Sequence, residues 1–316
     1  ILGVGIMLWM KPEENGVWEG EKTVEPGIGQ VVLTLGDGES MPLKRDTNRL
    51  IFGGTMLQVR NERGTLVYSK IKSKEASEKI VYNTLTVPVR ERFQLVLADG
   101  TKVFLNSGSE MRYPERFGKA RREVFLKGEA WFEVAKDSAR EFWVHAGAMD
   151  VKVLGTSFNV KAYERLETVA TTLVEGSVEV ACAGKSFQIV PGEQFVYDKN
   201  NRVMDVRMVD TESYVSWKDG YYKFRQTTLE EIMETLSVWY GLNVFYVNES
   251  AKQVEFTGKV KRYEDARMLL DKFEQTGDVV FDIKGNNVFI TIKQKKPFAR
   301  EWNSFLVKAR GMVWQS

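Results

Sequence analysis

Histidine and cysteine are almost missing from this chain of 316 residues, which has only His145 and Cys182. Histidine is the commonest general base and metal ligand near neutral pH, so a single one excludes a paired-histidine zinc site and a histidine relay. A single cysteine excludes an internal disulfide and a thiolate zinc cluster. We therefore expect no metal and no cofactor. His145 is predicted to be structural, and Cys182 a small buried apolar side chain.

An excess of charge of one sign is also missing, because 45 Lys and Arg residues face 43 Asp and Glu, for a net charge of +2. That value is too small for a nucleic-acid footprint, so no nucleic-acid partner is expected. What excess there is lies in the basic tail, residues 295–316. We predict that this tail is disordered. A helix lying on a membrane is the alternative, since apolar residues recur there at amphipathic spacing.

Long apolar runs are absent except at the start, where residues 1–10 carry no charge. Ten residues are half of the ~20 that cross a bilayer, and the chain begins at Ile1 rather than at methionine. We interpret residues 1–10 as the end of a membrane-spanning helix; a signal-peptide core or a buried first strand are the alternatives. Residues 11–24 form an acid-rich linker, unlike a cytoplasmic flank, so the rest should lie outside the cytoplasm.

Residues 25–207 predict an all-β domain, an antiparallel sandwich or roll. Residues 93–97 and 101–105 alternate around Asp99-Gly100, and such a pair favours a hairpin in which both central residues take positive φ. The segment 33–38 repeats this pattern 62 residues earlier in the chain, so we expect a duplicated hairpin. Further on, residues 124–126 and 130–134 are predicted as two strands on either side of Lys127-Gly128-Glu129.

After Asp210 the period changes, and residues 211–294 predict a separate α+β domain of β-α-β-β-α-β order. Thr228 and Glu231 form a capping box at the start of a helix, and Gly241 ends that helix. The other expected elements are strands at 221–224, 242–247, 254–260, 278–283 and 288–292, with a second helix around residues 266–273.

The segments that resemble catalytic motifs lie in a structural context that does not suit the chemistry. Gly184-Lys185-Ser186 resembles the end of a phosphate loop, but it joins two strands, where such a loop must open a helix. We interpret it as a hairpin turn and the chain as a non-enzyme. Two alternatives stay open: a secreted carbohydrate-binding β-module, and a hydrolase with a carboxylate pair. Trp131 and Trp143 could stack on sugars, but their apolar neighbours favour the core.

Five segments in register resemble the FecR family of sigma-factor regulators. Among them are Leu97-Ala98-Asp99-Gly100-Thr101 and Gly155-Thr156-Ser157-Phe158-Asn159. The segments are residues 87–93, 97–109, 126–134, 153–160 and 172–178. Residues 214–292 are similar to the C-terminal domain of such proteins and to the signalling domain of outer-membrane transducers.

The resemblance implies a relay across two membranes of a Gram-negative bacterium. It places this region in the periplasm, anchored by a single inner-membrane helix, and gives it two partners. One is the signalling domain of an outer-membrane TonB-dependent transporter. The other is an extracytoplasmic-function sigma factor, bound through a cytoplasmic segment that this sequence does not include. The resemblance assigns no binding residue.

Aromatic residues of the α+β domain are the candidate partner contacts. Alternation along the strand at 221–224 turns Tyr222 and Phe224 toward the helices and Tyr221 to the other face. Large rings of this kind often dominate interface energies. We therefore name Tyr221, together with an exposed tip at Trp239 and Tyr240, as the predicted partner-binding residues.

Overall fold

The computed structural model describes residues 29–44, 49–53, 57–62, 64–70, 80–262 and 265–293. The predicted spanning segment 1–10, the linker 11–24 and the basic tail 295–316 lie outside these ranges. Within them, no helix is both long and apolar enough to cross a membrane.

The first part of the chain forms a β domain whose strands belong to two sheets. In the first sheet nine strands lie side by side. Their order is β2 (Ser40–Leu43), β1 (Val31–Thr34), β6 (Tyr82–Thr86), β9 (Glu110–Pro114), β10 (Arg122–Glu133), β11 (Phe142–Ala146), β12 (Met149–Val153), β15 (Val178–Cys182) and β16 (Lys185–Ile189).

The second sheet shares β10 with the first and faces it. Its order is β3 (Arg49–Gly53), β4 (Leu57–Glu62), β5 (Thr65–Lys70), β7 (Phe93–Val96), β8 (Lys102–Leu105), β10, β13 (Ser157–Ala162), β14 (Thr168–Glu175), β17 (Glu193–Asp198) and β18 (Val203–Met208). The predicted β-rich class is confirmed. The sheets are not wholly antiparallel, because β10 runs parallel to β11 and β5 to β7.

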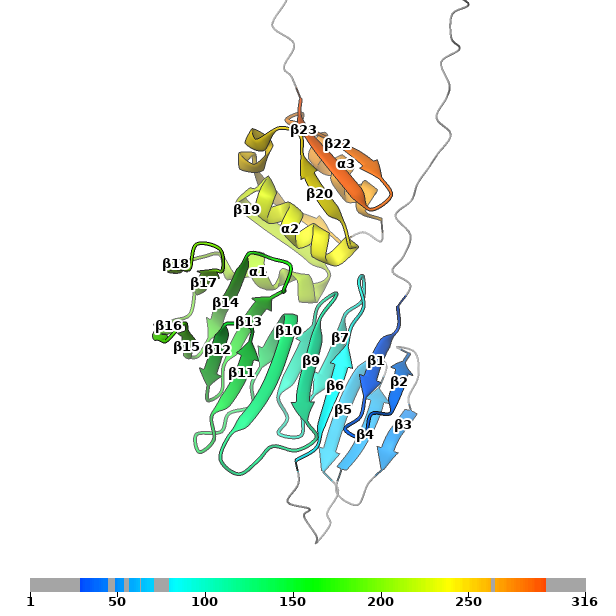
Figure 1. Cartoon of the computed structure of the whole chain (residues 1–316), viewed down its shortest axis with the longest axis vertical. Coiled ribbons are helices and arrows are strands. Elements are labelled where there is room, and N and C mark those ends of the chain that lie inside the picture. Colours follow the sequence, from blue (N-terminus) through cyan, green and yellow to red (C-terminus); the bar gives the residue numbers. More distant parts are fainter. Residues whose placement is uncertain are drawn as a thin grey trace, which may run out of the picture.

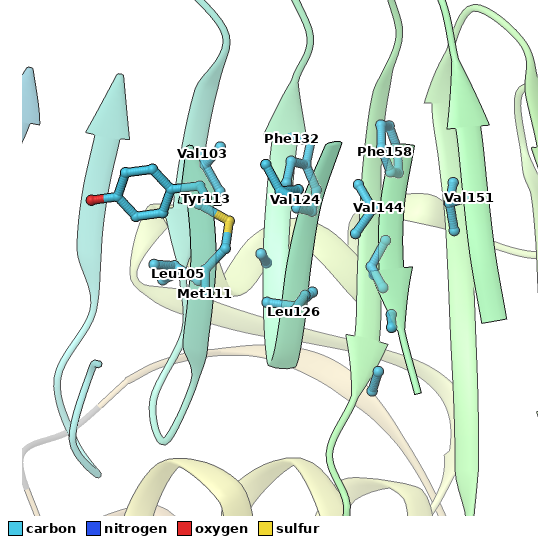
Figure 2. Close-up of a cluster of buried hydrophobic side chains, with 14 of the residues drawn as sticks. Val103, Leu105, Met111, Tyr113, Val124, Leu126, Phe132, Val144, Val151 and Phe158 are labelled. Atoms are coloured by element: carbon cyan, nitrogen blue, oxygen red, sulfur yellow. The ribbon is translucent and has the colours of Figure 1, made fainter. Parts of the chain in front are cut away.

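One apolar core fills the space between the two sheets. Alternate residues of each strand point into it, so Val124 and Val144 come from the first sheet while Phe132 and Phe158 come from the second. Figure 2 shows these side chains meeting between the strands. Alternation with a period of two is what a sheet with one buried face requires, and the sequence pattern had predicted it.

Strand β10 passes without a break from one sheet to the other. Arg122–Phe125 pairs with β11, and Gly128–Glu133 pairs with β13. The prediction of two strands around Lys127-Gly128-Glu129 is therefore wrong. Gly128 lies at the crossover with φ +103°, where an added Cβ would come within 2.4 Å of the Ser109 hydroxyl oxygen. Only glycine fits such a position without strain.

Two matching hairpins open the two halves of this domain. In β1–β2 the amide of Gly38 donates to the Leu35 carbonyl, and in β7–β8 the amide of Gly100 donates to the Leu97 carbonyl, both at 2.9 Å. Among the described residues of these turns only the two final glycines have positive φ. The hairpins are thus confirmed, but the predicted turn with two positive φ values is wrong. Each is a type I turn followed by a left-handed glycine.

The second part forms an α+β domain that follows a short helical connection. The connection and the domain consist of α1 (Thr211–Val215), η1 (Ser216–Asp219), β19 (Tyr221–Thr228), α2 (Leu229–Tyr240), β20 (Asn243–Tyr246), η2 (Glu249–Gln253), β21 (Glu255–Lys261), α3 (Ala266–Glu274), β22 (Val279–Lys284) and β23 (Asn287–Ile292). From β19 onward, leaving η2 aside, the order is β-α-β-β-α-β-β, so the predicted six-element order lacks the last strand.

Local sequence signals explain where α2 begins and ends. The Thr228 hydroxyl accepts a hydrogen bond from the backbone of Glu231, and Gly241 closes the helix in the left-handed region at φ +69°. Strands β19 and β21 make one small sheet and β20, β23 and β22 another. In Figure 1 this domain lies at one end of the β domain, with α2 facing it.

Candidate functional site

The junction between the two domains holds a cluster of buried polar groups. It is built from the loop after β8, the second half of β10, strand β13 and the carboxyl end of α2. Asn106 and Ser107 begin the loop, and both are buried. They belong to the Leu105-Asn106-Ser107-Gly108-Ser109 run in the family-like sequence segments, where the sequence alone suggested no role for them.

The β domain caps helix α2. The last carbonyls of a helix have no partner inside it, and Leu242 and Gly241 satisfy only that of Ser237. The Ser107 hydroxyl donates to the Val238 carbonyl at 3.1 Å, and the backbone amide of Arg90 donates to the Trp239 carbonyl at 3.1 Å. These bonds fix the end of α2 on the β domain.

A buried carboxylate lies beside this cap. Glu129 accepts hydrogen bonds from the side-chain amides of Asn106 at 2.8 Å and Asn159 at 2.9 Å. The Asn159 carbonyl in turn accepts from the indole N–H of Trp217 at 3.3 Å. The chain of bonds therefore runs from the β domain into the helical connection. Burial raises the pKa of Glu129, although Lys161 and the two amides act in the opposite direction.

The predicted contact tip at Trp239 and Tyr240 is not exposed. Only 7% of Trp239 and 2% of Tyr240 is accessible. The Trp239 ring lies under the Arg262 guanidinium at 3.7 Å, and its carbonyl is bound as described above. The expectation of exposure is wrong because both rings pack into the apolar core of the α+β domain itself.

Tyr221 does face away from the helices, while Tyr222 and Phe224 are buried among them. Its hydroxyl donates to the Glu212 carboxylate at 2.9 Å, and the Lys259 ammonium lies 3.7 Å from the ring centre. The hydrogen bond to Glu212 raises the pKa of Tyr221. The ring is thus held in one orientation at the surface, half-exposed. Its role in partner binding stays a prediction.

The remaining residues singled out in the sequence lie apart from the junction, with one exception. His145 bonds Asp150 at 2.7 Å and stacks on Phe125, and Cys182 is buried as predicted. Trp143 is half-buried on the outer face of the first sheet. Trp131 is the exception, since it is buried in the core of the α+β domain rather than in the β core. Among the described residues no group of three or more His, Cys, Asp or Glu is placed to hold a metal ion.

Comparisons with known proteins match both domains. The family model for the FecR protein matches residues 83–179, and the one described as FecR, C-terminal, matches residues 221–290. Together they cover more than half of the 316 residues. The chain belongs to the FecR family. The first FecR match contains the capping loop and Glu129, and the second contains α2, so the junction joins the two units that the family models match.

Two solved structures are similar to this FecR-family chain over most of its described length. Both are of a candidate anti-sigma factor from Parabacteroides distasonis ATCC 8503, at 1.65 Å and 2.50 Å resolution. The first is 28% identical with a TM-score of 0.61 and covers 66% of this chain and 98% of its own. The second is 27% identical with a TM-score of 0.60 and covers 67% and 99%. No curated protein matches this FecR-family chain.

Proposed function

We propose that this chain is the periplasmic part of an inner-membrane anti-sigma factor. In this proposal it relays the state of an outer-membrane TonB-dependent transporter to an extracytoplasmic-function sigma factor. Membership of the FecR family supports a sigma-factor regulator, and so does the similarity to a candidate anti-sigma factor. The sigma factor is assigned to a cytoplasmic segment outside this sequence, and the transporter to the α+β domain.

The capped end of α2 is the observation that carries the assignment to the α+β domain. Because the β domain holds this end, the opposite side of the α+β domain stays open to a partner. Tyr221 lies at the start of β19, beside the helical connection, and Glu212 and Lys259 orient its ring at the surface. Strands β20 and β21 are both edge strands among the described residues. Adding a partner strand to such an edge is a general mode of recognition, and an oriented aromatic ring is a typical anchor.

A pull-down with the purified signalling domain of the transporter tests this assignment. Tyr221→Ala should weaken binding by at least ~2 kcal/mol, or about thirtyfold, if the ring is an interface hot spot. Tyr82→Ala is the matched control, because Tyr82 is a half-buried strand tyrosine that belongs to β6 of the β domain. Deleting residues 214–294 should abolish binding. If the deletion binds as tightly as the parent, the partner surface belongs to the β domain.

A further inference from the structure

A cavity of about 180 Å³ lies between the two domains, next to Glu129. Its floor is the outer face of the second sheet, contributed by β13, β14 and β17, and its roof is α1, η1, β19 and α2. Drug-sized ligands occupy pockets of ~300–1,000 Å³, so this space suits a smaller occupant. It is about six times the ~30 Å³ that a water takes in the liquid, which is room for one substituted ring.

The floor of the cavity combines the apolar side chains of Ala170 and Val196 with buried polar ones. Thr172 and Gln194 are almost inaccessible, and the Gln194 amide donates to the Thr172 hydroxyl at 2.9 Å. Asn159 and Glu129 continue this surface toward the junction. A row of hydroxyl, amide and carboxyl groups can both donate and accept hydrogen bonds. The floor is therefore built for a molecule with several hydroxyl or amide groups.

The roof is aromatic, and it also holds a hydroxyl without a partner. Tyr214, Trp217 and Phe224 line it. The Ser213 hydroxyl oxygen is buried and makes no hydrogen bond, and Ser213 lines the same cavity. Since an unpaired buried polar atom costs free energy, a hydroxyl-bearing occupant would relieve that cost.

Apart from Glu129, whose partners are the amides of Asn106 and Asn159, several charged residues around the cavity form ion pairs. Lys161 lies 3.4 Å from Glu234, and Arg207 lies 3.8 Å from Glu231, so both pairs link the β domain to α2. Lys223 bonds Asp210 at 3.0 Å. A charged ligand would have to break one of these pairs or enter without a counter-ion. The arrangement favours an uncharged ligand.

We infer that this interdomain cavity binds one uncharged, hydroxyl-rich ring of monosaccharide size. One face of the ring lies against Trp217 and its aromatic neighbours, and the hydroxyl groups bond Thr172, Gln194 and Ser213. Both domains contribute to the site, so an occupant stabilises their contact. This inference is independent of the transporter assignment above, because Tyr221 does not line the cavity.

The test compares thermal unfolding of the full chain with and without four probes at equal millimolar concentration: D-glucose, D-galactose, D-mannose and N-acetyl-D-glucosamine. Binding to the folded state alone should raise the unfolding midpoint by at least ~2 °C for one of them. Sugars also stabilise proteins without binding, by exclusion from the surface. Ala170→Leu separates the two effects, because Ala170 lines the cavity and a leucine side chain would fill it. Ala148→Leu, in an exposed turn, is the control.

A midpoint shift in the parent and in Ala148→Leu that is absent in Ala170→Leu supports the site. An equal shift in all three proteins, or no shift with any probe, overturns it. Should Ala170→Leu fail to fold, Ser213→Ala replaces it, since this variant removes only the unpaired hydroxyl. Its dissociation constant for the active probe, measured by calorimetry, should be about fivefold larger than that of the parent. An unchanged constant would also overturn the proposal.

Discussion

The two halves of β10 bury charge in different ways. In the first half, Arg122 is fully buried inside the β domain and pairs with the Asp99 carboxylate at 2.8 Å. Its guanidinium also donates to the carbonyls of Ala135 and Arg140. In the second half, Glu129 is buried on the side of the second sheet that faces the α+β domain and lines the cavity between the domains. Its hydrogen-bond partners are amides, not a cation.

This difference separates two kinds of stability. The first half of the strand contacts the β domain alone, so substitutions there should lower the stability of that domain. The second half carries Trp131, which packs in the core of the α+β domain, and Glu129, which is linked to Trp217 of the helical connection through Asn159. Substitutions in this half should therefore loosen the contact between the domains. Three substitutions on this one strand, each with a control of the same residue type, can test the distinction.

Replacing Arg122 should have the largest effect. Arg122→Met leaves Asp99 buried without its cation, and removing one partner of a buried pair costs about 3–5 kcal/mol of unfolding free energy. Arg121→Met is the control, because Arg121 is exposed and pairs with Glu123 at the surface; such pairs contribute only about 0–1 kcal/mol. Urea unfolding of both variants gives the two values. Equal losses would show that burial of Arg122 does not matter.

Trp131→Ala should come next. Removing a buried tryptophan costs about 3 kcal/mol or more, and here the lost contacts are those with the α+β domain. We expect calorimetry to resolve two thermal transitions, with the α+β domain melting first. Trp143→Ala removes a half-buried indole from the first sheet and should lower stability without splitting the transition. A single transition in Trp131→Ala would argue against this separation of the two halves.

Glu129→Gln should have the smallest effect, and one that depends on pH. The amide presents an N–H₂ to Asn106 or Asn159, as the O–H of the protonated acid does, so Gln stands in for the protonated form and lacks one hydrogen bond of the carboxylate, at about 1–3 kcal/mol. Burial raises the folded-state pKa of Glu129 above its ordinary 4.5. Below pH 4.5 the protonated Glu129 therefore makes its full contribution to the free energy of unfolding of the parent. This contribution is lost as pH rises through the folded-state pKa.

The parent should accordingly lose stability relative to Glu129→Gln as pH rises above 4.5. Glu133→Gln, on the same strand but paired with Lys102 at the surface, is the control. Chemical unfolding at several pH values measures both variants. A difference that does not vary with pH would mean that Glu129 has the same pKa in the folded and unfolded states.

Local patterns were enough to predict most elements of this fold. Alternation marked the β strands, Asp-Gly pairs marked two hairpins, and the capping box at Thr228 placed the start of α2. These signals work because each depends on neighbours within a few residues. The local signals did not predict the crossover in β10, because Gly128 indicates a turn unless its contact with Ser109 is known.

The functional junction was harder to predict than the fold for the same reason. Trp239 and Tyr240 were expected to form an exposed tip at the end of α2, but contacts distant in the sequence bury them. Both rings lie in the core of the α+β domain, and Arg262 covers Trp239. Ser107 lay within a recognisable segment, yet its bond to Val238 spans 131 residues of sequence. Tyr221 was placed on its face correctly because strand alternation is a local rule.

The cap on α2 also decides how the molecule would bear mechanical load. The chain enters the α+β domain from β18, an edge strand held on one side only by β17. A pull on that domain through the chain alone would peel β18 away, breaking one hydrogen bond at a time. The bonds from Ser107 and Arg90 to α2 attach the same domain to the middle of the second sheet. Tension is then shared with the centre of the sheet, where strands must shear rather than peel.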